Sequence, residues 1–367
     1  MKKSCFIFAA GGSGGHIFPA LAIARSLKKE LPDSNIIFIG TRRGLETKII
    51  PENNFPLHYL SVGQLNKNAG LTRRFITLLL LPVAFMQSIL ILFRYRPRAV
   101  VGVGGYATGP MLLMASLLGF KSYLWEPNAY PGMANRILSS YVRMGFISFT
   151  ETLKHLKLKR NKIVGYPLRE QLDDPPLRQS HTLNEFRIFV FGGSQGSRGI
   201  NTAVFEMIKH PDFDFKSIKL VHQIGATDFK MMSQKYSELT AERRECVEFY
   251  EFIKDMPKYY QWADVAICRA GMGTIAELQA MSVPAILIPL PTAADNHQEM
   301  NARELLKEQA CRMILQKDLN ANSLWKEIFE LISDRKAVDQ MAENVHKFYK
   351  PRAAAEIANT IFKDLGS

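Results

Sequence analysis

The sequence predicts an α/β protein made of two doubly wound domains, each a parallel sheet with helices on both faces. Three observations lead to this fold class. Short apolar runs alternate with helical patterns along the chain, glycine-rich turns follow several of these runs, and the alternation stops at a proline-rich segment, residues 165–176, before it starts again. The chain of 367 residues is also long for a single hydrophobic core.

The first domain is predicted to span residues 1–168. It begins with an apolar strand at 5–10, a glycine loop, and a helix at 19–31 that Pro19 opens. Further apolar runs predict strands at 35–40, 99–103, 122–125 and 145–148.

The second domain is predicted to span residues 169–341 and repeats this order. Its strands are expected at 186–191, 218–225, 246–250, 265–268 and 285–289, with helices at 199–209 and from about Thr274. Residues 342–367 are predicted to form a C-terminal helix, because small and apolar side chains recur on one face of that segment.

The charge is divided unevenly between the two halves. Residues 1–168 hold 22 Lys and Arg against 6 Asp and Glu, and residues 169–367 hold 25 against 28. The basic half predicts contact with a polyanionic surface, either nucleic acid or anionic lipid. Nucleic acid is the weaker alternative, because basic residues do not alternate with aromatic ones and no nucleic-acid-binding module is recognisable.

Cysteine usage and the N-terminus indicate a cytoplasmic protein. Four cysteines are scattered without CxxC spacing, which predicts reduced and buried thiols. The segment after Met1 lacks the cleavage pattern of a signal peptide.

Residues 75–93 form an apolar run without a charged side chain, with arginines on both sides. The run just reaches the length of a membrane span. However, its flanking arginines give no positive-inside asymmetry, and a span would separate two strands that are expected to share one sheet. Besides a span, the run fits a wholly buried crossover helix or a helix whose apolar face lies in the bilayer interface. We favour the interfacial helix.

Three glycine loops, at 10–16, 102–110 and 191–197, each follow an apolar strand and precede a helix. Glycines let a ligand approach the backbone closely, so the set predicts phosphate or sugar binding. His16 lies at the mouth of the first helix, and histidine ordinarily titrates near neutrality, so His16 is a candidate general base.

The second glycine loop also fits a dinucleotide fingerprint. Gly102, Gly104 and Ala107 have the required spacing, and Glu126 follows at a suitable distance. A nicotinamide-dependent Rossmann oxidoreductase is therefore an alternative, although the fingerprint belongs on the first strand of such a domain.

Residues 265–298 predict a nucleotide-sugar pocket. A helix is expected to start beside Gly271 and Gly273, and the free N–H groups of a helix start bind phosphate. Glu277 falls one turn into that helix, within reach of a sugar hydroxyl. His297 and Gln298 follow the next strand and should lie on the same rim.

No cluster has the spacing of metal ligands. Asp212 and Asp214 resemble the acidic pair that holds a metal in some nucleotide-sugar enzymes, but they lie in a helix-to-strand connection without a glycine loop. We expect them on the surface, and we expect no metal or other cofactor.

Eight segments match one known family in order and spacing: 11–16 with Phe18 and Pro19, 102–110, 126–128 with 131–132, 165–169, 192–196, 252–256, 269–277 and 297–298. Together they resemble the MurG group of bacterial glycosyltransferases, in glycosyltransferase family 28, over essentially the whole chain. The resemblance implies the GT-B architecture, in which two Rossmann-like domains border an interdomain cleft and the C-terminal helix packs back on the first domain.

The resemblance also implies an activity. Such enzymes transfer N-acetylglucosamine with inversion from UDP-N-acetylglucosamine (UDP-GlcNAc) to the C4 hydroxyl of the N-acetylmuramoyl unit (MurNAc) of lipid I, giving lipid II for peptidoglycan. The expected partners are UDP-GlcNAc, undecaprenyl-linked lipid I, an anionic membrane surface and cell-wall synthesis proteins, at the cytoplasmic face of the cell membrane. Another GT-B transferase that moves a UDP-sugar to a lipid acceptor is the alternative.

The resemblance assigns roles to individual residues. Donor binding is expected of Arg169, Ser194, Ile253, Met272, Gly273, Thr274, Glu277, His297 and Gln298. Acceptor binding is expected of Ser13, Gly14, Gly15, Gly104, Gly105, Tyr106 and Asn128, with His16 as the catalytic base.

One segment departs from the family pattern. The family usually has His-Glu-Gln-Asn where this chain has Trp125, Glu126, Pro127 and Asn128. Proline fixes φ and removes a donor, so the local path of the chain to Asn128 is expected to differ.

Overall fold

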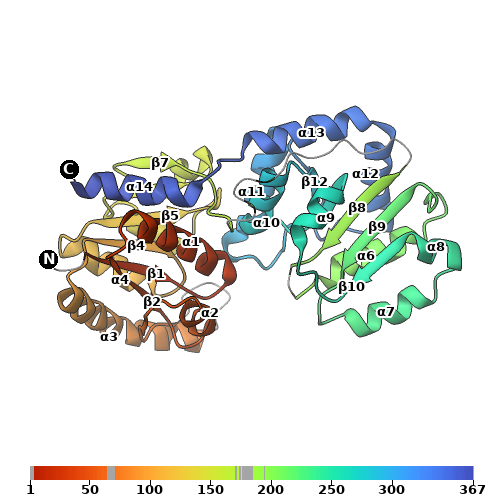
Figure 1. Ribbon diagram of the computed structural model, residues 1–367. Coiled ribbons are helices and arrows are strands. Elements are labelled where there is room, and N and C mark those ends of the chain that lie inside the picture. The colour runs from red at the N-terminus through yellow and green to blue at the C-terminus, as the bar shows by residue number, and fades with distance from the viewer. Residues whose placement is uncertain are drawn as a thin grey trace. The chain divides into compact units, whose positions relative to one another are not determined.

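The protein folds into two compact units, residues 1–173 with 350–367 and residues 174–349 (Figure 1). A computed structural model describes residues 4–63, 71–169, 172, 175, 185–193 and 195–366, without the side chains of 71–76. Each unit is a parallel sheet with helices on both faces, which confirms the predicted α/β fold class.

The first unit has a seven-stranded parallel sheet in the order β3-β2-β1-β4-β5-β6-β7. Its strands are β1 (Cys5–Ala10), β2 (Asn35–Gly40), β3 (Leu57–Tyr59), β4 (Ala99–Gly104), β5 (Ser122–Glu126), β6 (Met144–Ile147) and β7 (Asn161–Ile163). Its helices are α1 (Gly14–Glu30), α2 (Glu46–Glu52), α3 (Leu71–Tyr95), α4 (Thr108–Leu117), α5 (Met133–Leu138), η1 (Thr150–His155) and α14 (Ala353–Gly366).

The second unit has a six-stranded parallel sheet in the order β10-β9-β8-β11-β12-β13. Its strands are β8 (Phe186–Phe191), β9 (Ile218–Gln223), β10 (Val247–Tyr250), β11 (Val265–Cys268), β12 (Ala285–Leu287) and β13 (Arg312–Met313). Its helices are α6 (Arg198–Ile208), α7 (Phe229–Ser237), α8 (Ala241–Glu245), α9 (Met256–Trp262), α10 (Met272–Met281), η3 (Ala294–Asn296), α11 (His297–Lys307), α12 (Ala321–Ser333) and α13 (Arg335–Lys347).

Strand order positions a binding crevice in each sheet. In the first sheet the order reverses between β1 and β4, and in the second between β8 and β11. In open parallel sheets, ligands bind outside the carboxyl ends of the strands at this reversal. The glycine loops after β1 and β4, and those after β8 and β11, therefore flank the two predicted crevices.

The first helix differs from its prediction. α1 begins at Gly14 rather than at Pro19, so Pro19 lies inside it. Proline has no N–H, and the carbonyl of Gly15 loses its intrahelical donor. The hydroxyl of Tyr166 replaces that donor with a hydrogen bond of 2.9 Å to the Gly15 oxygen. This bond fixes the helix start beside the glycine loop.

The C-terminal segment and three strands also differ from the prediction. The single helix expected at 342–367 is two helices, α13 and α14, and α13 belongs to the second unit. Pro351 and Arg352, the latter with a positive φ of 56°, separate them. The short strands β3, β7 and β13 were not predicted, because runs of two or three residues show no periodicity.

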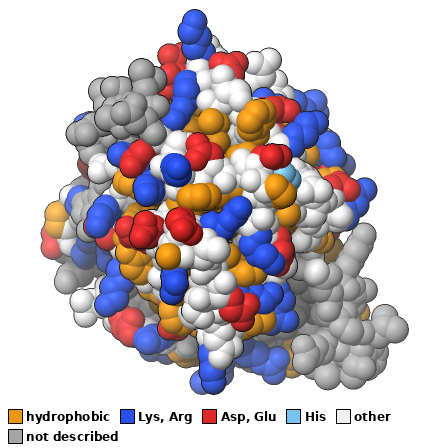
Figure 2. All heavy atoms as spheres, turned by 90° about the vertical axis from the view of Figure 1, so that its right-hand side faces the viewer, with side chains coloured by type: hydrophobic (Ala, Val, Ile, Leu, Met, Phe, Trp, Pro, Cys, Tyr) orange, Lys and Arg blue, Asp and Glu red, His pale blue; other side chains and the backbone are white. Residues whose placement is uncertain are grey.

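The face shown in Figure 2, which carries elements of the second unit, has interspersed Lys, Arg, Asp and Glu side chains. This mixture agrees with the near balance of charge in residues 169–367.

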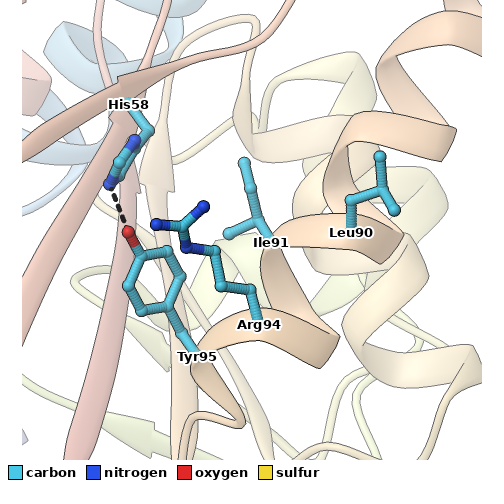
Figure 3. A pocket seen from close by; sticks show the side chains of 5 residues that line it. All are labelled: His58, Leu90, Ile91, Arg94 and Tyr95. Atoms are coloured by element: carbon cyan, nitrogen blue, oxygen red, sulfur yellow. Dashed lines mark hydrogen bonds between the residues drawn. The ribbon is translucent and has the colours of Figure 1, made fainter.

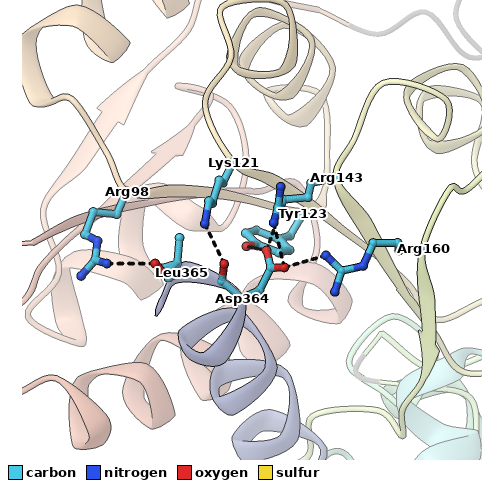
Figure 4. Close-up of polar contacts among 7 residues, drawn as sticks. All are labelled: Arg98, Lys121, Tyr123, Arg143, Arg160, Asp364 and Leu365. Carbon is cyan, nitrogen blue, oxygen red and sulfur yellow. Dashed lines mark hydrogen bonds and ion pairs between the residues drawn. The ribbon is translucent and has the colours of Figure 1, made fainter. Parts of the chain in front are cut away.

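α14 is held at the amino edge of the first sheet by converging cations (Figure 4). The Asp364 carboxylate is paired with Arg143 and, at 2.6 Å, with Arg160, and it accepts a hydrogen bond from Tyr123. Lys121 donates to the backbone oxygen of Asp364 at 2.7 Å. Lys121, Arg143 and Arg160 lie just before β5, β6 and β7, at the amino edge of the sheet. These cations therefore meet the negative end of the α14 dipole. The cations and hydrogen bonds hold the pKa of Asp364 well below its ordinary value.

Replacing Asp364 with Asn should reduce the free energy of unfolding by about 1–3 kcal/mol at pH 7, because two arginines lose their buried partner. The folded state lowers the pKa of Asp364 from an ordinary 3.8. The carboxylate therefore stabilises the fold fully above about pH 5, and this stabilisation is lost as the pH falls through 3.8 toward the lower pKa of the folded state. Urea denaturation followed by circular dichroism at pH 7 and pH 3 measures both effects.

Glu356→Gln is the matched control, since Glu356 lies on the same helix in an exposed pair with Lys162. Its effect should stay within about 0.5 kcal/mol. Equal losses in the two variants would contradict a special role for Asp364.

Candidate active site

In the first unit, the loops after β1 and β4 lie against each other without intervening side chains. The N–H of Gly11 donates to the Gly104 oxygen at 3.1 Å. A Cβ at Gly104 would lie 2.4 Å from the His16 ring, and a Cβ at Gly105 would lie 2.5 Å from the Gly11 oxygen. Both glycines have positive φ, 125° and 91°. The structure thus brings the predicted residues of the two loops together.

His16 is the third residue of α1, after the N-cap residue Ser13. Its ring is partly exposed at the carboxyl edge of the sheet, next to Gly104. Gly14 and Gly15 provide the first N–H groups of the helix, which favours an anion at this position. Tyr106 is half-buried in the facing loop, and burial raises the pKa of its hydroxyl.

A buried carboxylate that the sequence analysis missed organises the first glycine loop. Glu46, at the start of α2, is fully buried and accepts from the N–H of Gly12 at 2.8 Å. Its other oxygen accepts from the N–H and hydroxyl of Thr41, at 2.9 and 2.8 Å. Cβ atoms at Gly11 or Gly44 would collide with this carboxylate. The sequence signal was a lone glutamate two residues after Gly44.

A second buried carboxylate, Glu126, fixes Asn128. Its oxygens accept from the backbone and side-chain amides of Asn128, both at 2.9 Å, and from Gly132 and Asn135 at 3.0 and 2.8 Å. Burial raises the pKa of Glu126, while these donors act against the rise. Because the carboxylate is enclosed, it does not face a ribose, which argues against the dinucleotide alternative.

Trp125, which departs from the family pattern, lies in β5 just before this loop. It is buried and packs edge-on against Tyr166, with ring centroids 5.2 Å apart. Tyr166 is the residue that caps the Gly15 carbonyl. The departure therefore contributes to the support of the first glycine loop.

Arg169 lies in the first unit, apart from the unit that holds the other predicted donor residues. Its guanidinium lies 4.8 Å from the centre of the Phe18 ring, on α1. The side chain is exposed.

In the second unit, α10 presents unpaired N–H groups at the end of β11. Gly271 is the N-cap residue, and the first intrahelical bond runs from Ile275 to Gly271 at 3.0 Å. The amides of Met272, Gly273 and Thr274 precede that bond, so the helix itself offers them no acceptor. α10 begins two residues before the predicted start, which places Gly273 inside it.

Glu277 lies one turn into α10 and is oriented by a buried tyrosine. Tyr260 donates its hydroxyl to Glu277 Oε2 at 2.7 Å. The Tyr260 ring packs edge-on against Phe189 and Phe191, with centroids 5.6 and 5.7 Å away. Burial and the Glu277 charge raise the pKa of Tyr260, which keeps it a neutral donor.

Gln298 and His297 begin α11 beside this helix start. Gln298 accepts from the N–H of Leu290 at 3.0 Å, and its amide nitrogen lies 3.9 Å from where a Cβ of Gly271 would be. The ring of His297 contacts the Ala294 oxygen at 2.7 Å. The structure thus places Gln298 at the rim of α10, as predicted.

Arg269 is a partly buried cation beside the same helix, and its role was not predicted. Its guanidinium donates to the oxygens of Ile288 and Pro289 at 3.0 and 3.2 Å, and to Ser197 and Gln316 at 2.7 Å each. Burial lowers the pKa of the guanidinium. All these acceptors are neutral, so the positive charge adds to the potential that favours an anion at the helix start.

The remaining predicted residues divide into three cases. Ile253 is buried, and its N–H is bound by the side chain of Gln223. Ser194 lies outside the described residues. Asp214 bonds to Ser217 and its neighbours, and Asp212 is exposed, as expected for surface residues. Within the described parts of the chain, no three His, Cys, Asp or Glu side chains are grouped so that they could share a metal ion.

Comparison with known proteins identifies relatives along the whole chain. Residues 6–147 match the glycosyltransferase family 28 N-terminal domain, and residues 187–357 match the glycosyltransferase family 28 C-terminal domain.

Two curated relatives have the same printed name, UDP-N-acetylglucosamine--N-acetylmuramyl-(pentapeptide) pyrophosphoryl-undecaprenol N-acetylglucosamine transferase. The one from Bdellovibrio bacteriovorus is 45% identical over 98% of this chain and 99% of its own length. The one from Anaeromyxobacter sp. (strain K) is 38% identical over 96% and 90%. A crystal structure of Acinetobacter baumannii MurG superposes with a TM-score of 0.82 at 27% identity, covering 98% of this chain and 99% of that one.

Replacing Glu46 with Gln should destabilise the first unit by about 1–3 kcal/mol. Both carboxylate oxygens of Glu46 accept hydrogen bonds, and the amide NH2 group of Gln would face a donor instead of accepting from it. The measurement is the urea midpoint of unfolding. Glu52→Gln is the control on the same helix, since Glu52 is exposed, and it should change stability little. A wild-type midpoint for Glu46→Gln would contradict the organising role.

Proposed function

The chain belongs to glycosyltransferase family 28, and from this membership we propose that it transfers N-acetylglucosamine from UDP-GlcNAc to the MurNAc C4 hydroxyl of lipid I. The product would be lipid II, the precursor of peptidoglycan. Relatives that match almost the full chain are named for this transfer.

The observation that carries the proposal is the start of α10. Three backbone N–H groups, from Met272 to Thr274, lie at the positive end of the helix, with the partly buried Arg269 charge nearby. Glu277 is held one turn away by Tyr260. A diphosphate at the helix start and ribose hydroxyls at Glu277 would match the chemistry of these two groups, as a nucleoside diphosphate sugar requires.

The donor would therefore bind mainly to the second unit. In this proposal the Met272, Gly273 and Thr274 amides bind the diphosphate together with Ser194, while Ile253 and Arg169 meet the uridine. His297 and Gln298 face the sugar. Gln298 already lies beside the helix start, which supports this assignment.

The acceptor would bind to the first unit. The loop glycines Gly14, Gly15, Gly104 and Gly105 would approach its diphosphate, and Ser13, Tyr106 and Asn128 would position it. This role is supported by the close approach of the two loops and by the N–H groups at the start of α1.

The reaction would be a single inverting displacement. His16 removes the proton from the MurNAc hydroxyl, whose oxygen attacks the anomeric carbon as UDP leaves. The N–H groups of α10 stabilise the negative charge that develops on UDP, which a preorganised helix start does without reorganisation. No step of this mechanism requires a metal ion.

Replacing His16 with Ala should lower kcat for UDP release in the presence of lipid I by about 10²–10⁴, the usual contribution of a general base. UDP binding should be unchanged, since the proposed donor residues other than Arg169 lie in the second unit. The assay follows UDP release and lipid II formation by the purified protein.

His210→Ala is the control, because His210 packs on Trp325 in the second unit and is not one of the proposed site residues. A kcat within about threefold of wild type for His16→Ala would exclude His16 as the base. Wild-type protein that forms no lipid II would overturn the proposed function.

We also propose that α3 lies on the membrane surface, at the cytoplasmic face of the cell membrane. Residues 77–95 are long and apolar enough to cross a membrane, but α3 connects β3 and β4 of one sheet and packs against α4. Only 22% of that apolar window is buried, so the alternative of a wholly buried helix is wrong. Its exposed apolar side chains are Leu78, Leu79, Val83, Met86, Leu90 and Phe93.

Charge at the end of α3 supports a lipid surface (Figure 3). Arg94 lies beside Tyr95, whose hydroxyl is 2.9 Å from His58 Nε2, and with Leu90 and Ile91 they line a hollow of about 220 Å³. An apolar face next to exposed arginines is typical of helices that lie in the interface of anionic bilayers.

Replacing Leu79, Met86 and Leu90 with Ser should reduce binding to phosphatidylglycerol vesicles about tenfold or more, since each leucine or methionine contributes about 1.5–3 kcal/mol when fully buried. These side chains are 62%, 56% and 63% exposed, so the fold should persist. Vesicle sedimentation measures binding, and circular dichroism checks the fold.

Phe329→Ser is the control, because Phe329 is equally exposed on α12 of the second unit. Unfolding of the triple variant would mean that this face of α3 is part of the core. Unchanged sedimentation would contradict the membrane proposal.

A further inference from the structure

We propose that Gln223 is a positioning residue that holds both the loop proposed to meet the base and the loop proposed to meet the diphosphate. The inference rests on the proposed UDP-sugar site and adds a residue to it.

The side chain of Gln223 connects two separate loops. Gln223 is the last residue of β9 and is 3% exposed. Its Oε1 accepts from the N–H of Ile253 at 2.8 Å, in the loop after β10. Its Nε2 donates to the oxygen of Gly193 at 3.1 Å, in the glycine loop after β8. One amide group therefore fixes one loop proposed to meet the uridine and another proposed to meet the diphosphate.

The end of β9 that carries Gln223 is itself held rigidly. The neighbouring His222 is buried, with Nδ1 2.7 Å from the Tyr236 hydroxyl and Nε2 3.0 Å from Asn201 Oδ1. Asn201 also donates to the Ile224 oxygen at 3.0 Å. Burial lowers the pKa of His222 to about 3, so its ring is neutral at physiological pH. The strand end is thus a fixed point from which Gln223 reaches both loops.

The glycine loop needs such a support because of its backbone. Gly193 and Gly196 have positive φ, 91° and 79°. A Cβ at Gly196 would lie 2.0 Å from the Ile224 oxygen, so this loop also touches the β9 end through its backbone. The bond to the Gly193 oxygen therefore helps to hold Gly193, the start of this loop, in place.

The two hydrogen bonds can be separated by substitution. In Gln223→Glu, a carboxylate oxygen still accepts from Ile253, but the second oxygen faces the Gly193 carbonyl and repels it. In Gln223→Leu, both bonds are lost. We therefore expect Gln223→Glu to weaken binding of the diphosphate only, and Gln223→Leu to weaken binding of both the uridine and the diphosphate.

The experiment measures inhibition constants of uridine and UDP in the transferase assay. For Gln223→Glu, we expect uridine within about twofold of wild type and UDP weakened about tenfold, the effect of one lost buried hydrogen bond. For Gln223→Leu, we expect uridine to be weakened about tenfold and UDP, which uses both loops, about a hundredfold. Asn344→Leu is the control, since Asn344 is a buried amide on α13 whose partners include Gln309 and Lys347, outside the site.

Each outcome decides between the alternatives. Equal weakening of uridine and UDP in Gln223→Glu, or no change in Gln223→Leu, would overturn the positioning of the two loops by Gln223. If Gln223→Leu does not fold, the ratio of the uridine and UDP inhibition constants in Gln223→Glu still tests the proposal. If the wild-type protein binds neither uridine nor UDP, the proposed function itself is overturned. If the wild-type protein binds both but the Gln223 variants do not change uridine and UDP binding as expected, only the role of Gln223 is overturned.

Discussion

Both units depend on close backbone contact between neighbouring loops at the carboxyl ends of parallel strands. Adjacent strands lie about 4.8 Å apart, so loops that continue them in the same direction have no room for side chains between them. In the first unit this contact joins Gly105 to Gly11, and in the second it joins Gly196 to Gly225, where a Cβ would lie 2.5 Å or less from backbone atoms. The glycines therefore keep N–H groups and short polar side chains close to any ligand at the strand ends.

The sequence was sufficient to predict this framework. Strands that are covered on both faces are apolar throughout, and glycine clusters mark the ends at which the chain turns into a helix. β1, β2, β8 and β11 have the predicted bounds. The start of α1 was wrong for a physical reason: Gly14 and Gly15 have low helix propensity, and their helical conformation depends on a tertiary bond from Tyr166 that no local pattern shows.

The site was only partly predictable for the same reason. Residues that present backbone or a side chain directly to the crevice, such as Gly104 and Glu277, lie in motifs with recognisable spacing. Those that hold them, such as Glu46, Tyr260 and Gln223, are single polar residues whose partners lie far away in the chain. From the sequence alone each would be assigned to the surface, because burial of a polar group is favourable only when tertiary structure supplies its partners.

The buried acids also change the interpretation of the basic half. Residues 1–168 have six acidic side chains, and two of them, Glu46 and Glu126, are enclosed and bound by amide or hydroxyl donors. They are withdrawn from the surface, so the exposed charge of this unit is more positive than its composition indicates. At the amino edge of the sheet, Asp364 neutralises arginines locally. Arg94, at the end of α3, has no such carboxylate among the described ion pairs. Its positive charge therefore stays unbalanced beside the exposed apolar face of α3, and an anionic bilayer attracts this combination.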